Sequence, residues 1–506
     1  MGPFGKGARR ICAVVAGRTA AKMAVQVRAA LRETRTVELR LDWLRSDKER
    51  ARLLRWLKKA KPRGANFLAT CRRRPSGGRL AGDVGDELHW LRQAGDAGCL
   101  WCDLGIETLR ELRGQPIREL GLPPRVLLSV HDFRRMPPLG RVLNSLSHSD
   151  VDAVKIAANA KTIGDSVRLL RVVRRSKKMV AVPMGDVGLP ARMLALREGS
   201  ALAYAPVAEA TAPGQVSLIE MKRLYRAHKL TRRTRVYGVI GDPVGHSLSP
   251  LLHNTGFVAR RVDAVYLPFL VPELRDFLRA IPELGIRGFS VTLPHKQSIL
   301  RHLADCEPLA AEIGAVNTVV VRRDGSLYGC NTDYVGVLRA LQKKLPLAGS
   351  RVLIFGAGGS ARAAAFALAR AGAIVNICAR RERPAKELAH AVGGEVVPRR
   401  ALGREYFDAI LNSTPVGMHP QAAISPLAGR ELNCRIVMDL IYRPQRTQLL
   451  RHAAQKGITT VSGVEMFLAQ GIAQWEIWTE RRAPEAAMRA AVLGALRSEE
   501  KFRSRR

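Results

Sequence analysis

Residues 153–185, AVKIAANAKTIGDSVRLLRVVRRSKKMVAVPMG, decide the fold of the first half of the chain. AVKIAAN and MVAVPMG have the length and composition of buried strands, and TIGDSVRLLRVVRRS between them has the pattern of a helix. This order predicts a parallel strand–helix–strand unit. Lys155 stands inside the first apolar run, where a buried ammonium needs a partner, an exit to solvent or a chemical role.

The same unit repeats along the first 228 residues. Eight strand-like runs bounded by turn residues read ICAVVAG, TVELRLDWL, NFLATCR, CLWCDLGI, RVLLSVHDF, AVKIAAN, MVAVPMG and ALAYAPV. Helical stretches such as SDKERARLLRWLKKA separate them. We expect a closed (β/α)8 barrel, because eight evenly spaced units favour closure over a doubly wound open sheet.

Composition limits the classes of partner. The 506 residues carry 83 Lys and Arg against 44 Asp and Glu, a net charge of +39. Such a charge suits nucleic acid, an anionic surface or small anionic substrates. The basic residues are scattered and accompany no nucleic-acid motif, and no apolar run approaches the ~18 residues of a membrane span. We therefore expect no nucleic acid and no membrane. The expected oligomeric state is a monomer or a homodimer.

The eight cysteines indicate neither a disulfide framework nor a metal site. Cys99 and Cys102 form a CxxC, but no second pair follows to complete a zinc site. We expect buried thiols and no metal. The first predicted strand begins near residue 11, which leaves no length for a signal or transit peptide, so we expect the protein in the reducing cytoplasm.

Polar residues in or near the strand ends are candidates for chemistry, because barrel enzymes act at the carboxyl ends of their strands. For two of these residues, Asp42 and Asp132, a surface salt bridge is the preferred interpretation. Desolvation and nearby arginines disfavour the ammonium form of Lys155, and a free amine attacks carbonyl carbons to form a Schiff base. An imine-forming aldolase is one alternative. The candidates are Glu38, Arg40, Asp42, Arg72, His131, Asp132, Lys155 and Arg192.

These motifs resemble a known family. VELRLD, TCR, SVHDF, VKIA, MG followed by Arg192, and TAPGQ occur in the order and near the spacing of type I 3-dehydroquinate dehydratases. The resemblance implies a TIM barrel in which Lys155 forms the imine and His131 is the general acid/base. It also implies substrate and lid contacts for Glu38, Arg40, Arg72, Arg192, Thr211 and Gln215.

The chain departs from that family at Ser76, where a glutamate commonly orients the histidine. A serine cannot stabilise an imidazolium as a carboxylate does. Asp83 or Asp86 could replace the glutamate. A first domain with weakened catalysis is therefore an alternative.

A nucleotide site is predicted in the second half, after the basic stretch HKLTRRTR at 228–235. RVLIFGAGGSARAAAFALARAG, at 351–372, gives a strand, a GxGxxA loop and a helix, the fingerprint of a dinucleotide-binding Rossmann unit. Arg380 and Arg381 end the following strand, where an NAD site offers an acidic residue, so NADP is favoured. The predicted loop contacts are Gly356, Ala357, Gly358, Gly359, Ser360 and Ala361.

Other motifs of this half resemble shikimate dehydrogenases over about 236–480: GDPVGHSLSP, SVTLPHK, GAVNT, NTD, NSTPVGM, DLIY and GVEMFLAQ. Lys296 and Asp333 are an acid/base candidate pair, and the resemblance places them at the reacting oxygen. Ser290 and Ala379 stand where many members have asparagine. The other implied roles are substrate contacts by Ser247, Ser249, Thr292, Asn317, Tyr442 and Gln470, and nicotinamide contacts by Gly463 and Met466.

The two resemblances describe consecutive reactions, since dehydration of 3-dehydroquinate yields the ketone that a shikimate dehydrogenase reduces. We expect a dehydratase barrel at 8–228, a substrate domain at 235–340, a Rossmann domain at 341–480 with helices returning to about 497, and a charged tail at 498–506. The expected ligands are small carboxylates and NADP. A preference for quinate, and a basic binding protein with a decayed enzyme core, are the alternatives.

Overall fold

The computed structural model describes residues 3–60, 62–113, 115–146, 150–208, 215–245, 247–418 and 420–503. The chain forms two compact units, one of Met1–Arg235 with Leu267–Gly285 and one of Val236–Tyr266 with Ile286–Arg506. Within the described ranges, no helix has both the length and the apolar character needed to cross a bilayer.

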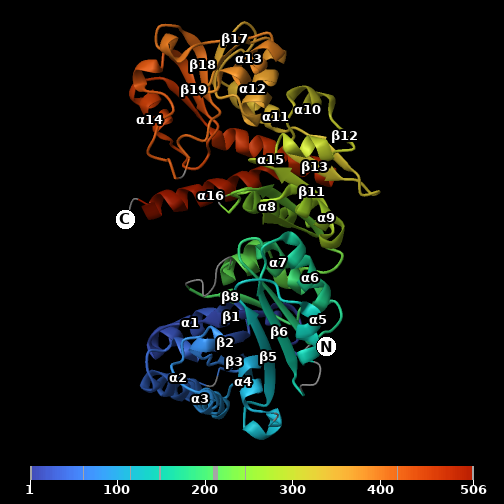
Figure 1. The fold of residues 1–506 in the computed structure, drawn as a ribbon. Coiled ribbons are helices and arrows are strands. Elements are labelled where there is room, and N and C mark those ends of the chain that lie inside the picture. The colour runs from blue at the N-terminus through green and yellow to red at the C-terminus, as the bar shows by residue number, and fades with distance from the viewer. Residues whose placement is uncertain are drawn as a thin grey trace. The chain divides into compact units, whose positions relative to one another are not determined.

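The first unit contains the expected barrel (Figure 1). β1 pairs with both β2 and β8, so the sheet curves round on itself in the order β7-β6-β5-β4-β3-β2-β1-β8. Among the described residues only the junction of β7 with β8 lacks a ladder, and the barrel is nearly closed. Its strands are β1 (Ile11–Val15), β2 (Thr36–Arg40), β3 (Asn66–Thr70), β4 (Trp101–Gly105), β5 (Arg125–Asp132), β6 (Ala153–Asn159), β7 (Met179–Met184) and β8 (Ala203–Pro206).

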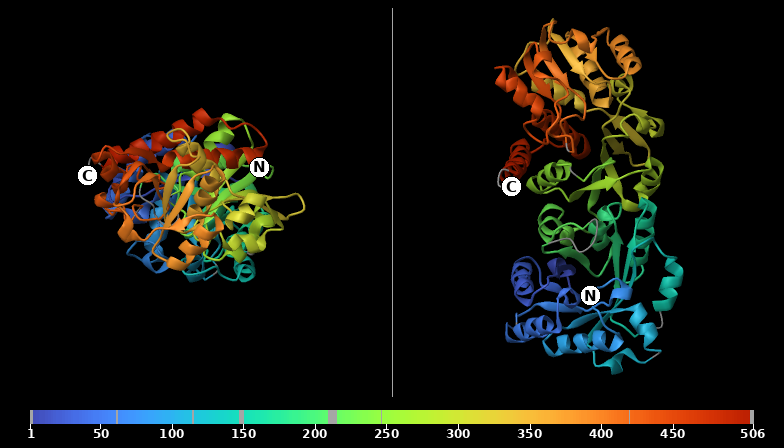
Figure 2. Two further views of the ribbon diagram at one scale, coloured as in Figure 1. Left: turned by 90° about the horizontal axis from the view of Figure 1, so that it is seen from above. Right: turned by 60° about the vertical axis from the view of Figure 1, so that its left-hand side comes forward.

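Helices follow most of these strands and surround the barrel (Figures 1 and 2). Residues such as Ile156 and Ala158 face outward to them, in a cluster that includes the helical residues Leu169 and Val173. The helices are α1 (Ala20–Glu33), α2 (Asp47–Ala60), α3 (Val84–Asp96), α4 (Ile106–Glu111), α5 (Leu139–Leu146), α6 (Ile163–Val173) and α7 (Leu189–Glu198).

The strand register decides which side chains enter the barrel. Thr70 lies opposite Asp103, Asp103 opposite Leu127, and Ser129 opposite Lys155. Residues paired across parallel strands share a face, as do residues two apart on one strand. These side chains therefore all point inward. Below the polar ones lies an apolar cluster that includes Cys12, Leu68, Trp101, Leu127, Ala153 and Val180.

The second half contains a mixed six-stranded sheet in the order β10-β9-β11-β13-β14-β12. β9 and β11 are parallel, whereas β13 is antiparallel to both β11 and β14. The strands are β9 (Arg235–Gly241), β10 (Ala264–Leu270), β11 (Ile286–Val291), β12 (Asp305–Cys306), β13 (Thr318–Val321) and β14 (Leu327–Cys330). The helices of this segment are α8 (Ser249–Ala259), α9 (Leu274–Leu284), α10 (Pro308–Ile313) and α11 (Asp333–Leu341).

The third sheet is parallel and doubly wound, in the order β17-β16-β15-β18-β19-β20. Strand order reverses between β15 and β18, the place where such sheets bind nucleotides. α12 (Gly359–Arg370) and α13 (Glu382–Ala391) cover one face, and α14 (Gln448–Gln455) covers the other (Figure 1). Its strands are β15 (Arg351–Phe355), β16 (Ile374–Cys378), β17 (Glu395–Val396), β18 (Phe407–Asn412), β19 (Cys434–Asp439) and β20 (Thr459–Ser462).

Two C-terminal helices return to the mixed sheet's helices. α15 (Gly463–Thr479) packs on α11 and α8, and α16 (Glu485–Arg503) packs on α8. α11 and α15 approach closely at Gly336, where a Cβ would lie 2.7 Å from Met466 Cγ. α16 continues to Arg503, so most of the segment expected to be a charged tail is helical.

Two candidate active sites

The barrel contains a cavity of about 280 Å³, which is lined in part by inward-facing strand residues. It unites the described residues that sequence analysis assigned to the dehydratase. Thr211 lies outside the described residues. The assigned residues that line the cavity are Glu38, Arg40, Arg72, His131, Lys155, Arg192 and Gln215.

The partner of Lys155 is Asp103, in the middle of β4. Lys155 Nζ forms a buried ion pair with Asp103 Oδ2. Asp103 Oδ1 accepts hydrogen bonds from Arg72 Nη2 at 2.6 Å and Ser129 Oγ at 2.5 Å. Burial alone would raise the pKa of Asp103, but the Lys155 ammonium and the Arg72 guanidinium hold that pKa well below its ordinary value. A buried carboxylate thus bridges two cations, Lys155 and Arg72, that both line the cavity.

This geometry adds an acidic partner to the arginines that were expected near Lys155. Besides Asp103, the Tyr204 ring lies 4.8 Å from Nζ. Asp103 was not among the residues expected from the sequence, because CLWCDLGI was interpreted through its two cysteines. Strand alternation could have identified it, since an inward position at the carboxyl half of a barrel strand is where a charged side chain meets the others.

His131 is oriented by an arginine. Arg72 Nη1 lies 2.5 Å from His131 Nδ1, and because a guanidinium only donates, Nδ1 accepts and the neutral ring carries its proton on Nε2. Burial, followed by the charges of Arg72 and Lys155, holds the pKa of His131 well below its ordinary value. Arg72, which was expected to contact the substrate, thus lines the cavity and also binds Asp103 and His131.

Neither acidic residue considered as a substitute for the missing glutamate orients His131. Asp83 and Asp86 form the capping box of α3, in which each carboxylate accepts the other's backbone N–H, at 3.0 and 3.1 Å. Ser76 ends a short 3-10 turn at Arg74–Ser76. Arg72 orients the His131 ring in place of the expected carboxylate, but its positive charge disfavours the imidazolium that a carboxylate would stabilise.

Two other polar predictions have different outcomes. Asp42 pairs with Arg40 through two hydrogen bonds of 2.9 and 2.8 Å, but it is 2% exposed, so the pair is not the surface salt bridge expected. Asp132 forms no ion pair among the described residues and instead accepts the backbone N–H groups of Arg134 and Arg135, both at 3.0 Å. Asp132 shapes the loop after β5.

Glu38 and Arg192 complete the described cavity. Glu38 is buried and accepts a hydrogen bond from Thr70 Oγ1 at 2.7 Å. Arg192 Nε donates to the Pro183 carbonyl at 2.6 Å, and burial lowers the pKa of Arg192 to about 10. Arg192 remains a cation at neutral pH and can bind a carboxylate.

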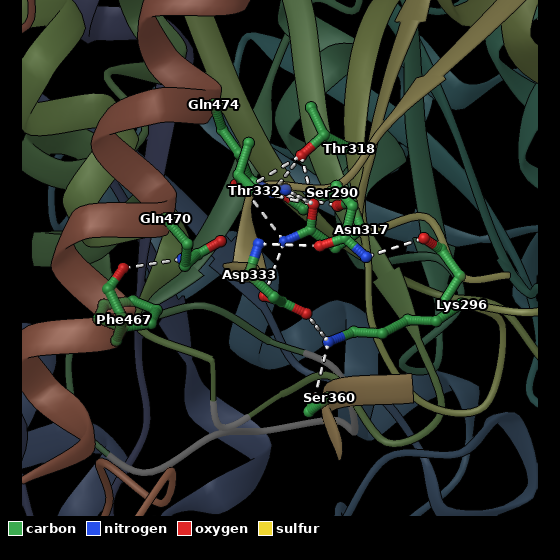
Figure 3. Close-up of polar contacts among 12 residues, drawn as sticks. Ser290, Lys296, Asn317, Thr318, Thr332, Asp333, Ser360, Phe467, Gln470 and Gln474 are labelled. Atoms are coloured by element: carbon green, nitrogen blue, oxygen red, sulfur yellow. Dashed lines mark hydrogen bonds and ion pairs between the residues drawn. The ribbon is translucent and has the colours of Figure 1, made fainter. Parts of the chain in front are cut away.

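A second polar cluster joins the mixed sheet to the glycine loop (Figure 3). Lys296 Nζ donates to Asp333 Oδ2 at 2.6 Å and to Ser360 Oγ at 3.2 Å. Asn317 Nδ2 donates to the other Asp333 oxygen at 2.7 Å. Asp333 begins α11 and Ser360 lies in the first turn of α12. An amine and a carboxylate thus lie next to the loop predicted to hold the nucleotide.

Gln474 of α15 supports this cluster through hydrogen bonds to its neighbours. It was not among the residues expected from the sequence. Its Nε2 donates to the Asn317 carbonyl at 3.0 Å and to Thr318 Oγ1 at 2.9 Å, and its Oε1 accepts from Ser290 at 2.8 Å (Figure 3). The position one helical turn after Gln470 was the available signal. Ser290 is therefore buried in this network.

Tyr442 contacts both α15 and the loop that carries Ser247 and Ser249. The Ser249 N–H donates to Ser247 Oγ at 3.2 Å, and the Leu248 N–H donates to the Tyr442 hydroxyl at 3.5 Å. Tyr442 stacks on Phe467 at 4.2 Å between centroids. Gln470, whose Nε2 donates to the Phe467 carbonyl at 2.8 Å, lies on the same helix (Figure 3). Thr292 follows β11 and is half-buried.

The glycine loop has the shape a dinucleotide needs. Gly356 has φ +122°, and a Cβ there would lie 2.5 Å from Ser413 Oγ. Gly358 caps α12 and faces open space, whereas Ala361 is fully buried. A Cβ at Gly359 would lie 3.4 Å from Lys296 Cβ, and Ala357 is half-buried. The helix N-terminus thus remains open to a pyrophosphate.

Arg380 and Arg381 follow β16 and are exposed. In the part of the chain that the structure describes, neither forms an ion pair, whereas Arg383 donates to Glu387 at 2.9 Å. Two uncommitted guanidinium groups beside a nucleotide loop fit a 2′-phosphate. Gly463 and Met466, in the first turn of α15, are both buried.

Three family models match the chain. The type I 3-dehydroquinase model matches residues 11–232. The shikimate dehydrogenase substrate binding domain matches residues 239–319, and the shikimate 5′-dehydrogenase C-terminal domain matches residues 463–493.

Similar proteins agree with these models. The chloroplastic bifunctional 3-dehydroquinate dehydratase/shikimate dehydrogenase of Arabidopsis thaliana is 33% identical over 505 residues, which cover 94% of this chain and 83% of that protein. The shikimate dehydrogenase (NADP(+)) of Methanothermobacter thermautotrophicus is 42% identical over 276 residues, 52% of this chain and 97% of that protein. A solved shikimate dehydrogenase in complex with NADP+ is 34% identical with a TM-score of 0.50, covering 53% of this chain and 97% of that one.

Proposed function

This chain belongs to the family of bifunctional 3-dehydroquinate dehydratases/shikimate dehydrogenases, and from that membership we propose that it dehydrates 3-dehydroquinate and reduces the resulting 3-dehydroshikimate with NADPH. The observation that carries the proposal is the barrel cavity, in which Lys155 and His131 lie among arginines. We assign dehydration to about 8–228, shikimate binding to about 235–340, and nucleotide binding to about 341–480.

Dehydration proceeds through an imine on Lys155. The Lys155 amine, after giving up its proton, attacks the ketone, and loss of water forms the imine. The imine withdraws electrons as a proton leaves the neighbouring carbon and the hydroxyl departs as water, and hydrolysis restores the lysine. His131 moves these protons, and because Arg72 occupies Nδ1 in the free protein, Arg72 must turn to the substrate before that nitrogen can act as a base.

Reduction uses the second cluster. NADPH supplies the hydride, and the residues here bind and protonate. Lys296 Nζ, held by Asp333, donates a proton to the carbonyl oxygen as it becomes a hydroxyl. Asn317 fixes Asp333 and, together with Thr292 and Gln470, receives the ring hydroxyls. Ser247 and Ser249 bind the carboxylate of the substrate, and Tyr442 lines the substrate pocket.

Borohydride trapping tests the dehydratase. Incubation with 3-dehydroquinate and borohydride, followed by peptide mass mapping, should place the adduct on the peptide that contains Lys155. Lys155→Ala should abolish both trapping and dehydration while the same preparation still reduces 3-dehydroshikimate. Normal turnover with unlabelled Lys155 would contradict the imine.

Substrate and cofactor pairs test the dehydrogenase. We expect oxidation of shikimate with NADP+ to exceed the rates of the pairs containing quinate or NAD+. Replacing both Arg380 and Arg381 with alanine should raise KM for NADPH at least about tenfold and leave KM for NADH unchanged, since charged hydrogen bonds contribute about 1.5–3 kcal/mol each. Arg383→Ala is the matched control, because Arg383 is paired with Glu387.

We further propose that the protein acts in the cytoplasm as a monomer or homodimer, on small carboxylates and without nucleic acid. The eight cysteines are all free, which supports a reducing compartment. Light scattering after size exclusion measures the oligomeric state. Tight nucleic-acid binding at physiological salt, together with absence of both activities, would instead favour the decayed-enzyme alternative.

A further inference from the structure

One more guanidinium belongs to the dehydratase cavity. Arg79 and Trp43 both line it, although neither was among the expected site residues. The Arg79 guanidinium carbon lies 3.5 Å from the centroid of the Trp43 ring. Arg79 is exposed, and it forms no ion pair among the described residues. It therefore differs from Arg40 and Arg72, whose charges face carboxylates inside the site.

The backbone holds Arg79 in this place. The Arg79 N–H donates to Asp42 Oδ2 at 3.2 Å, the same oxygen that accepts from Arg40 Nη2 at 2.8 Å. The next residue, Leu80, donates its N–H to the Arg72 carbonyl at 3.0 Å. At Gly78 a Cβ would lie 1.9 Å from that carbonyl, so the loop is pressed against the strand end. Arg79 is thus fixed relative to the cavity residues.

Stacking leaves the hydrogen-bonding capacity of the guanidinium available. The Trp43 ring covers one face of the group, whereas its five N–H donors lie in its plane. A stacked, uncommitted guanidinium on a cavity wall matches a carboxylate in charge and in planar geometry.

We propose that Arg79, supported by Trp43, recognises the carboxylate of the dehydratase substrate at the cavity wall, in addition to Arg192. This inference rests on the proposed dehydratase activity. It assigns Arg79 a binding role for one functional group of the substrate, and Trp43 a positioning role for Arg79.

A carboxylate-free substrate isolates that interaction. Arg79→Gln should lower kcat/KM about tenfold for 3-dehydroquinate, mostly through KM, and less than about twofold for its carboxamide, because only the acid offers a charged acceptor. Arg79→Lys should retain an intermediate value, since the charge remains and the planar fork is lost. Trp43→Leu should also lower kcat/KM for 3-dehydroquinate more than for the carboxamide, because Trp43 positions Arg79.

Arg28→Gln is the matched control, because Arg28 is also an exposed arginine near a tryptophan, 5.8 Å from the Trp56 ring centroid, but does not line the cavity. Shikimate oxidation by each preparation verifies folding. Equal losses for acid and amide, or no loss in Arg79→Gln, would overturn the inference. Absence of dehydration by the wild-type protein would instead overturn the proposed function.

Discussion

At the residue scale, Lys155 illustrates why a buried charge needs its partner identified. The sequence places a lysine in an apolar strand, and the structure pairs it with Asp103, which also binds Arg72. One carboxylate thus compensates two buried cations. Removing one partner of a buried pair costs more than the pair contributes, because the remaining charge stays desolvated.

Asp103→Leu should therefore lower the free energy of unfolding of the barrel by about 3–5 kcal/mol. Hydrogen exchange of peptides from β4 to β6 measures this loss in a defined part of the chain. Asp150→Leu is the control: its pair with Arg118 is exposed, with side chains 70% and 79% accessible, and exposed pairs contribute about 0–1 kcal/mol. Similar effects of the two substitutions would contradict the buried pair.

At the element scale, the start of α15 lies directly against the loop that follows β19. Gly463 makes this approach possible, because a Cβ there would lie 2.5 Å from the Leu440 carbonyl oxygen and 2.6 Å from that of Ile441. α15 also carries Met466, Gln470 and Gln474. Its position along the axis therefore sets the positions of several expected contacts at once.

Gly463→Ala should displace α15 and lower dehydrogenase kcat/KM more than about tenfold, since 1 Å of misplacement can cost about a hundredfold. Dehydratase activity of the same preparation should not change. Gly494→Ala, in α16 where a Cβ meets nothing within 4 Å, should leave both activities intact. Full dehydrogenase activity in Gly463→Ala would show that the helix start tolerates the methyl group.

At the scale of the whole molecule, two buried carboxyls give the two halves opposite pH responses. Asp439, at the end of β19, accepts from Asn412 and Thr447, and burial raises its pKa to about 6. Its contribution to stability is complete below the ordinary pKa of about 3.9 and is lost as pH rises through 6. Asp103, with a lowered pKa, contributes above about pH 3.9 and loses that contribution in stronger acid.

Lowering the pH from 7 to 5 should therefore stabilise the β18–β19 region by about 1 kcal/mol. The contribution of Asp103 to the stability of β4 should not change over this range. Hydrogen exchange of peptides from both regions, corrected for intrinsic exchange rates, measures the difference. Asp439→Asn should remove the pH response of β18–β19, because the amide does not titrate. A response unchanged by that substitution would assign it to another group.

The barrel, the glycine loop and seven of the residues that line the barrel cavity could be predicted from the sequence, because strand–helix periodicity and short motifs are local properties. Only the tertiary structure decided that Lys155 pairs with Asp103, that Arg72 orients His131, that Gln474 supports Asn317, and that Arg79 stacks on Trp43. These pairs bring together residues between 36 and 157 positions apart, and strand register, helix position and loop closure determine which of them meet.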